Sequence, residues 1–146
     1  MEISYGPARA GDEDTIFELC KALIYRYEDL SAIDVPEVMN WVREKIRNGL
    51  DTYRRIYADG IHAGFCRLEP GEDGMTELDD LYVLPDFQNR GIGTRVIRDA
   101  LSEAKEPVML YVFIRNDGAC RLYQRLGFEI RKTIGNSRYI MVREKL

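Results

Sequence analysis

The sequence has few of the residues that mark a disulfide framework, a metal site or a membrane-spanning segment. It contains 3 Cys and 1 His. An odd number of widely spaced cysteines without a histidine cluster supports neither a disulfide framework nor a metal site, so we expect buried thiols. The longest apolar run, residues 108–114, falls far short of the ~20 residues that a membrane-spanning helix needs. Residues 1–4 contain no basic segment followed by an apolar one, so we expect no membrane association and a cytoplasmic location.

An excess of positive charge is also missing. The 21 Lys and Arg residues are outnumbered by 25 Asp and Glu residues, which gives a net charge of −4. This balance argues against a nucleic-acid-binding groove and mildly favours a cationic small-molecule partner. The 146 residues are 45% hydrophobic and 32% charged, without repeats or a low-complexity linker. These values exclude a disordered chain and predict one domain over residues 1–146.

Hydrophobic periodicity predicts strands and helices in the order β-αα-βββ-α-β-α-ββ. The expected strands are residues 3–8, 52–58, 61–69, 75–84, 108–114, 128–133 and 139–144, and the expected helices are residues 12–27, 34–49, 92–104 and 118–126. Asp59-Gly60 indicates a type I′ hairpin. The wholly apolar strand 108–114 is expected at the centre of the sheet, beside a parallel neighbour. The prediction is an α/β fold, a single mixed β-sheet flanked by helices.

Several side chains have expected positions in these elements. Asp12 is expected to cap the first helix, and Asp34, followed by Pro36, is expected to cap the second. The only histidine, His62, is expected on the face opposite Phe65, as a surface or sheet-packing residue. The apolar face of the second helix is expected to consist of Val38, Trp41, Val42 and Ile46.

A change of phase in strand 75–84 predicts a β-bulge. Leu78 lies at an even position, whereas Leu81 and Val83 lie at odd positions, with Asp79 and Asp80 between them. Because side chains alternate with a period of two, the change of phase needs one extra residue. Bulges are frequent beside active sites.

A glycine-rich segment joins this strand to the next helix. Two glycines allow the backbone to approach a ligand, and the free N–H groups of the helix favour an anion such as phosphate. The segment lacks the Gly-Lys-Ser/Thr of a Walker A loop and the third glycine of a dinucleotide fingerprint. A turn that merely starts a helix is the alternative. The segment consists of Gln88, Asn89, Arg90, Gly91, Ile92, Gly93 and Thr94.

Two longer strings resemble the GCN5-related N-acetyltransferase family. The string from Leu81 to Gly93 contains Gln-Asn-Arg-Gly-Ile-Gly and is similar to the acyl-CoA pyrophosphate loop of that family. The string from Asn116 to Phe128 is similar to its Asn-x-x-Ala-x-x-Leu-Tyr-x-x-x-Gly-Phe segment. The resemblance extends over essentially the whole chain and implies the acyl-CoA N-acyltransferase fold, with acetyl-CoA as cosubstrate.

The resemblance also implies where the cosubstrate binds. Backbone amides from Gln88 to Thr94 would hold the pyrophosphate of coenzyme A. Backbone groups of Leu81 and Val83 would pair with its pantetheine arm, which would lie like an added strand in a gap beside the bulge. Asn116 matches the position that often contacts this arm.

Two catalytic residues follow from the resemblance. Tyr123 matches the tyrosine that commonly protonates the leaving thiolate, as a phenol of pKa ~10 can do for a thiolate of pKa roughly 8–9. A core aromatic residue is the alternative. Glu77 lies fourteen positions before Gly91, the spacing at which histone-type members place their general base. Asp79 and Asp80 are the other candidates, and solvated strand-end charges are the alternative for all three carboxylates.

The motifs indicate the chemistry of the reaction but do not select one acceptor. We expect direct transfer of an acetyl group to a primary amine, with a small amine or an amino acid favoured over a protein or peptide. Residues 25–34, which join the first two helices, are expected near the acceptor, or else form a solvated loop. A non-catalytic acyl-CoA sensor, a longer acyl group and a ping-pong route through Cys120 are alternatives. The chain is expected to be a monomer or a homodimer.

Overall fold

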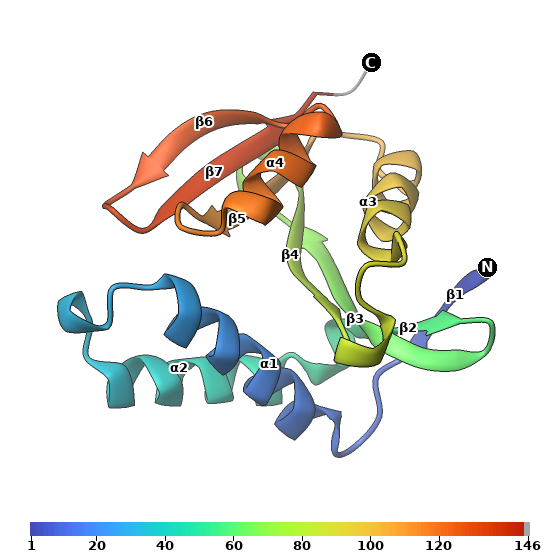
Figure 1. The fold of residues 1–146 in the computed structure, drawn as a ribbon, viewed down its shortest axis with the longest axis horizontal. Helices are drawn as coiled ribbons and strands as arrows, with labels where there is room; N and C mark the ends of the chain where they lie inside the picture. Colours follow the sequence, from blue (N-terminus) through green and yellow to red (C-terminus); the bar gives the residue numbers. More distant parts are fainter. Residues whose placement is uncertain (145–146) are drawn as a thin grey trace.

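The fold is a single mixed sheet of seven strands flanked by four helices, as predicted. A computed structural model describes residues 1–144, and its strand order is β1-β2-β3-β4-β5-β7-β6 (Figure 1). The strands are β1 Ile3–Pro7, β2 Tyr53–Ala58, β3 Ile61–Pro70, β4 Thr76–Val83, β5 Val108–Phe113, β6 Glu129–Ile134 and β7 Arg138–Arg143. The helices are α1 Asp12–Tyr27, α2 Val35–Asn48, α3 Ile92–Glu103 and α4 Asp117–Arg125. No helix within residues 1–144 is both long and apolar enough to cross a bilayer.

The cap expected for α2 is confirmed, and the cap expected for α1 is wrong. The Asp34 side chain accepts a hydrogen bond from the Glu37 amide at 3.1 Å, and Gly49 ends the helix. In α1, Gly11 takes the cap position with a φ of 96°. Asp12 is already the first helical residue, and its buried carboxylate accepts two hydrogen bonds from Arg55 of β2, at 2.7 and 2.8 Å. The carboxylate therefore ties the start of α1 to the sheet.

The core is divided between the two faces of the sheet. On one face, α1 and α2 lie side by side (Figure 1) and pack on β2, β3 and β4 through a cluster that includes Ile16, Phe17, Ile46 and Phe65. On the other face, α3 packs on the first strands and α4 packs over β5. This arrangement leaves the middle strands, β4 and β5, between two pairs of helices.

The bulge predicted in β4 is confirmed, and it lies where β4 and β5 separate. Arg67 of β3 pairs with Asp80 and the next residue, Leu68, pairs with Leu78, so Asp79 is the extra residue. β4 pairs in parallel with β5 only at Thr76 and Glu77. Beyond Glu77 the two strands continue without pairing, which leaves a gap in the middle of the sheet.

A second bulge changes the expected position of His62. The Asp59-Gly60 turn has positive φ at both residues, 50° and 80°, as a type I′ hairpin requires. The register then shifts, because Ile56 pairs with Gly64 and Tyr57 pairs with His62. The His62 ring lies 4.7 Å from the Phe65 ring, edge to face, so the expectation that they occupy opposite faces is wrong.

Candidate active site

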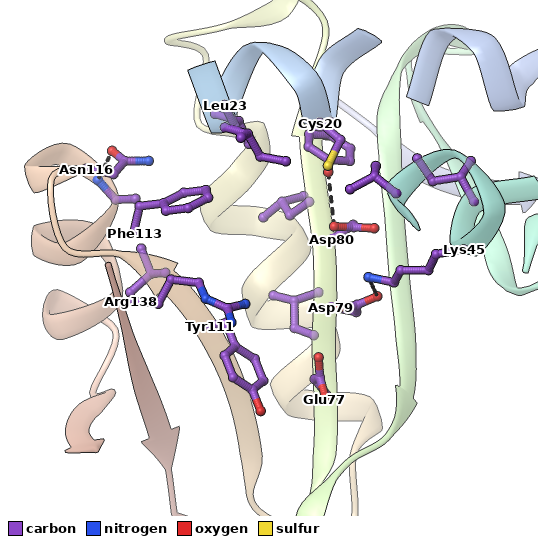
Figure 2. A pocket seen from close by; sticks show the side chains of 18 of the residues that line it. Cys20, Leu23, Lys45, Glu77, Asp79, Asp80, Tyr111, Phe113, Asn116 and Arg138 are labelled. Atoms are coloured by element: carbon purple, nitrogen blue, oxygen red, sulfur yellow. Dashed lines mark hydrogen bonds and ion pairs between the residues drawn. The ribbon is translucent and has the colours of Figure 1, made fainter. Parts of the chain in front are cut away.

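A cavity of about 590 Å³ opens where β4 and β5 diverge. Residues of α1 and α2 form one wall, and β4, β5 and the start of α4 form the others (Figure 2). Its polar lining residues include Lys45, Glu69, Glu77, Asp79, Asp80, Tyr111, Asn116, Tyr123 and Arg138. Residues far apart in the sequence are therefore brought together at one point of the sheet.

The β4 bulge places three carboxylates along this cavity. Without an extra residue, Glu77 and Asp79 would share a face and Asp80 would point to the opposite one. Because Asp79 is the extra residue, Glu77, Asp79 and Asp80 all line the cavity. One carboxylate oxygen from each of Glu69, Glu77 and Asp79 lies within 4.8 Å of the others. Such close like charges favour protonation of one member.

Asp79 is held as a carboxylate by two cations. It accepts hydrogen bonds from Nη1 of Arg67 at 2.5 Å and from Nζ of Lys45 at 2.9 Å. Burial alone would raise the pKa of Asp79, but Lys45, a hydrogen bond from Glu77 and Arg67 outweigh burial and hold this pKa below its usual range. A carboxylate with a low pKa and two cationic partners is a weak proton acceptor.

Asp80 belongs to a hydrogen-bonded group deeper in the cavity. It accepts hydrogen bonds from the hydroxyl groups of Tyr53 and Tyr82, the latter at 3.0 Å. Burial and the negative charge of Asp79 raise the pKa of Asp80. Burial, followed by the Asp80 charge, also raises the pKa of the Cys20 thiol at this end of the cavity, to about 11. Cys20 is therefore a protonated thiol at neutral pH.

Glu77 is the carboxylate best suited to exchange a proton near neutral pH. Burial raises the pKa of Glu77 to about 7, and its hydrogen bond with Asp79 and the charges of Asp79 and Glu69 act in the same direction. A general base is most effective when its pKa lies near the working pH. This pKa suits a proton acceptor, which is the role expected for Glu77 from the sequence.

Tyr123 of α4 and Asn116, the N-cap residue of the same helix, also line the cavity. The Tyr123 ring contacts Phe128 edge to face, with centroids 5.8 Å apart. Burial raises the pKa of Tyr123 to about 12, so its phenol is a proton donor at neutral pH. The Asn116 side chain caps α4 by accepting a hydrogen bond from the Ala119 amide at 3.2 Å.

The backbone edge of β4 faces the gap at Leu81 and Val83. The Leu84 amide donates to the Ala63 carbonyl of the β3 side at 2.8 Å. Because backbone groups alternate along a strand, the amides of Leu81 and Val83 point to the opposite edge, where β5 has separated from β4. The side-chain amide of Gln88 donates to the Val83 carbonyl at 3.0 Å.

The glycine-rich segment forms a turn that opens α3. Asn89 and Gly91 have positive φ values of 63° and 80°, and Gly91 is the N-cap. The first intrahelical bond runs from the Arg95 amide to the Gly91 carbonyl, so the preceding amides of the first turn are directed outward. A Cβ added at Gly91 or Gly93 would meet no atom within 4 Å. Packing within the chain therefore does not require glycine at position 93.

Some residues that were expected near the site lie outside the cavity. Some residues that line the cavity were not predicted from the sequence. Residues 25–34, Cys120 and the glycine-rich segment do not line the cavity. Trp41 was expected on the buried face of α2, but its side chain is 63% exposed at the cavity wall. Lys45, Tyr111 and Arg138 also line it. The helical spacing of Trp41 and Lys45 placed both near one face of α2, but nothing in the sequence indicated Arg138.

Comparisons with known proteins agree with this geometry. Residues 19–128 match the family described as the acetyltransferase (GNAT) family. An uncharacterized N-acetyltransferase of Methanocaldococcus jannaschii is 41% identical over 64 residues, which cover 41% of this chain and 28% of that protein. The spermine/spermidine N(1)-acetyltransferase of Bacillus subtilis is 26% identical over 102 residues, 61% of this chain and 67% of that protein.

A solved structure shares the whole fold. PaiA N-acetyltransferase from Thermoplasma acidophilum, crystallised with coenzyme A, matches with a TM-score of 0.68 and 22% identity over 99% of each chain. The split sheet, with a glycine turn and a helix after β4, is the architecture of an acyl-CoA N-acyltransferase fold. The match over residues 19–128 shows that the chain belongs to the acetyltransferase (GNAT) family, and the resemblance found in the sequence is confirmed.

Proposed function

We propose that this chain, as one domain over residues 1–146, transfers an acetyl group from acetyl-CoA directly to a primary amine. The observation that carries the proposal is the cavity at the β4–β5 gap, which is lined by Glu77 of β4 and Tyr123 of α4. A proton acceptor near neutral pH and a proton donor thus line the same space. Amine acetylation needs both, one to deprotonate the amine and one to protonate the leaving thiolate.

The chain has groups that fit coenzyme A along a continuous path. The outward amides at the start of α3 suit a pyrophosphate, and the open space in front of Gly91 and Gly93 permits its close approach. The amides of Leu81 and Val83 suit an extended pantetheine arm, which would pair with β4 like another strand. The arm would reach the cavity beside Asn116. Acetyl-CoA supplies the activated acetyl group as a thioester.

The proposed reaction uses three groups of the chain. Glu77 accepts a proton from the acceptor ammonium, so that nitrogen has a lone pair for attack on the carbonyl carbon. The Leu81 amide stabilises the negative charge that develops on the carbonyl oxygen. As the carbonyl re-forms and the C–S bond breaks, Tyr123 donates its hydroxyl proton to the departing sulfur. The attacking nitrogen loses its second proton, which restores the phenol, so that the products are a neutral amide and a thiol. Cys120 takes no part, because it does not line the cavity and burial raises the pKa of its thiol.

A small acceptor suits the cavity better than a folded protein. The cavity has a volume of about 590 Å³ and is walled on one side by α1 and α2, where Trp41 has most of its surface exposed. The Bacillus relative is named for small polyamine acceptors. A non-catalytic acyl-CoA sensor is the second candidate, and it predicts binding without turnover.

The test is mass spectrometry of products after incubation with acetyl-CoA and a panel of amines, amino acids and peptides. Acetylated product from the wild type, with strong reduction in Tyr123→Phe, supports the proposal and identifies the acceptor class. Saturable binding of acetyl-CoA without product from any acceptor supports the sensor. Absence of acetyl-CoA binding contradicts both functions.

A further inference from the structure

Arg138 brings a positive charge to the cavity wall, and no carboxylate in the described part of the chain forms an ion pair with it. It lies at the start of β7, is half-buried and lines the cavity. Its guanidinium carbon lies 5.1 Å from the centre of the Tyr111 ring. Within residues 1–144, no carboxylate oxygen lies within 4.0 Å of its guanidinium nitrogens.

The other lining cation and three of the four lining carboxylates already have partners within the chain. Asp79 is bound by Lys45 and Arg67, and Arg67 also pairs with Glu69 through Nη2 at 2.7 Å. Asp80 accepts hydrogen bonds from two tyrosine hydroxyl groups. Lys45 is thus engaged by Asp79, and Arg138 is the lining cation that has no carboxylate partner among residues 1–144 and is left to pair with a ligand.

Strand register fixes the direction of Arg138. It pairs with Phe113 of β5, and Tyr111 lies two residues before Phe113 on the same face of the sheet. This diagonal relation brings the guanidinium over the Tyr111 ring. Figure 2 shows Arg138 reaching across the gap from β7, with Tyr111 below it and Glu77 on the opposite wall. Stacking on a ring holds a guanidinium in one plane and leaves its N–H edge available.

We propose that the acceptor is an aminocarboxylate, whose carboxylate binds Arg138 while its primary amine faces Glu77. This inference rests on the proposed acetyl transfer. A guanidinium binds a carboxylate through two parallel hydrogen bonds, which fixes orientation as well as charge. Arg138 and Glu77 stand on different strands across the cavity, so the two ends of one small molecule meet complementary groups. Arg138 is then a specificity-determining residue.

The test compares acceptors that differ only in the carboxylate. The pairs are β-alanine with β-alaninamide, 5-aminopentanoate with 5-aminopentanamide, and lysine with cadaverine. Initial rates of thiol release, with mass-spectrometric identification of the product, give kcat/KM for each. We expect kcat/KM for at least one carboxylate acceptor to exceed that of its partner without the carboxylate by about tenfold or more, as hydrogen bonds between charged groups provide.

Substitution of Arg138 assigns this preference to one side chain. We expect Arg138→Gln and Arg138→Met to remove the preference, mainly by raising KM for the carboxylate acceptor. The methionine keeps an apolar side chain over Tyr111. Arg138→Lys keeps the positive charge and is expected to retain part of the preference for the carboxylate acceptor. Arg131→Gln is the matched control, because Arg131 is exposed on β6 and pairs with Glu144 at 2.8 Å. We expect this control to behave as the wild type.

The outcomes separate this inference from the proposed function. If the wild type acetylates amines but prefers no carboxylate in any pair, or if Arg138→Met retains the preference, the inference is wrong and acetyl transfer stands. If cadaverine is preferred to lysine and no other carboxylate is favoured, the inference is also wrong. If no amine is acetylated while acetyl-CoA binds, both are wrong.

Discussion

The acid limb of the pH profile is expected to identify Glu77 as the proton acceptor. The pKa of Glu77, raised to about 7 by burial and by Asp79, means that ~10% of this group is ionised at pH 6 and ~90% at pH 8. If Glu77 takes the proton from the bound ammonium, kcat/KM for total amine rises with unit slope below pH 7. It then stays level up to the pKa of the amine, ~10.

Glu77→Gln is expected to remove the break near pH 7, where the rise of kcat/KM with pH changes to a level region. The variant can use only the free amine, which is ~0.1% of an amine of pKa ~10 at pH 7. A positioned general base contributes ~10²–10⁴-fold, so a loss of kcat/KM in this range is expected at pH 7, and the loss is expected to shrink towards pH 10, where free amine is abundant. Initial rates from pH 5.5 to 10, with two acceptors of different amine pKa, measure this.

Two results test whether Glu77 is the proton acceptor. A break that stays near pH 7 in Glu77→Gln, or a loss of equal size at every pH, contradicts the assignment. Asp79→Asn provides a second check, because it removes the adjacent negative charge and leaves Lys45 beside Glu77. In that variant the break is expected to move below pH 7. A break that moves upward contradicts the electrostatic account of Glu77.

Three further predictions concern proton donation, cosubstrate binding and the sheet. Tyr123→Phe is expected to lower kcat by ~10²–10³-fold with unchanged affinity for coenzyme A by calorimetry; equal kcat excludes Tyr123 as the acid. Gly93→Asp adds an acidic residue to the first turn of α3, so thermal stability should hold or rise while coenzyme A affinity falls at least tenfold; retained affinity places the pyrophosphate elsewhere. A Cβ at position 64 would lie 2.1 Å from the Tyr82 carbonyl oxygen, so Gly64→Ala should lower the free energy of unfolding by roughly 3 kcal/mol. Urea titration measures this against Gly93→Ala, which has open space, and a loss under 0.5 kcal/mol for Gly64→Ala would contradict the contact.

Local signals in the sequence account for much of the fold. The cap at Asp34, the Asp59-Gly60 turn and the bulge beside Asp79 each depend on neighbouring residues, and the structure shows all three. The sequence left open which of the three carboxylates share a face, and the position of the bulge in the structure decides it. Motif spacing singled out Glu77 and Tyr123, and both line the cavity.

Features that depend on contacts distant in the sequence were not predictable. Asp12 looked like a helix cap, but its carboxylate binds Arg55, 43 residues later. Trp41 fits the apolar period of α2, yet the open cavity leaves it exposed. The position of Arg138 depends on the register between β5 and β7, and periodicity within one strand carries no information about its partner.

The most direct measurement of the central claim is the fate of the acetyl group. Acetyl-CoA labelled with ¹³C in the acetyl group is incubated with the protein and the best acceptor from the panel, and free thiol and labelled amide are quantified together. The account predicts one labelled N-acetyl product for each thiol released, with both strongly reduced in Glu77→Gln at pH 7. Thiol release without labelled amide, or binding of acetyl-CoA without either product, would contradict it.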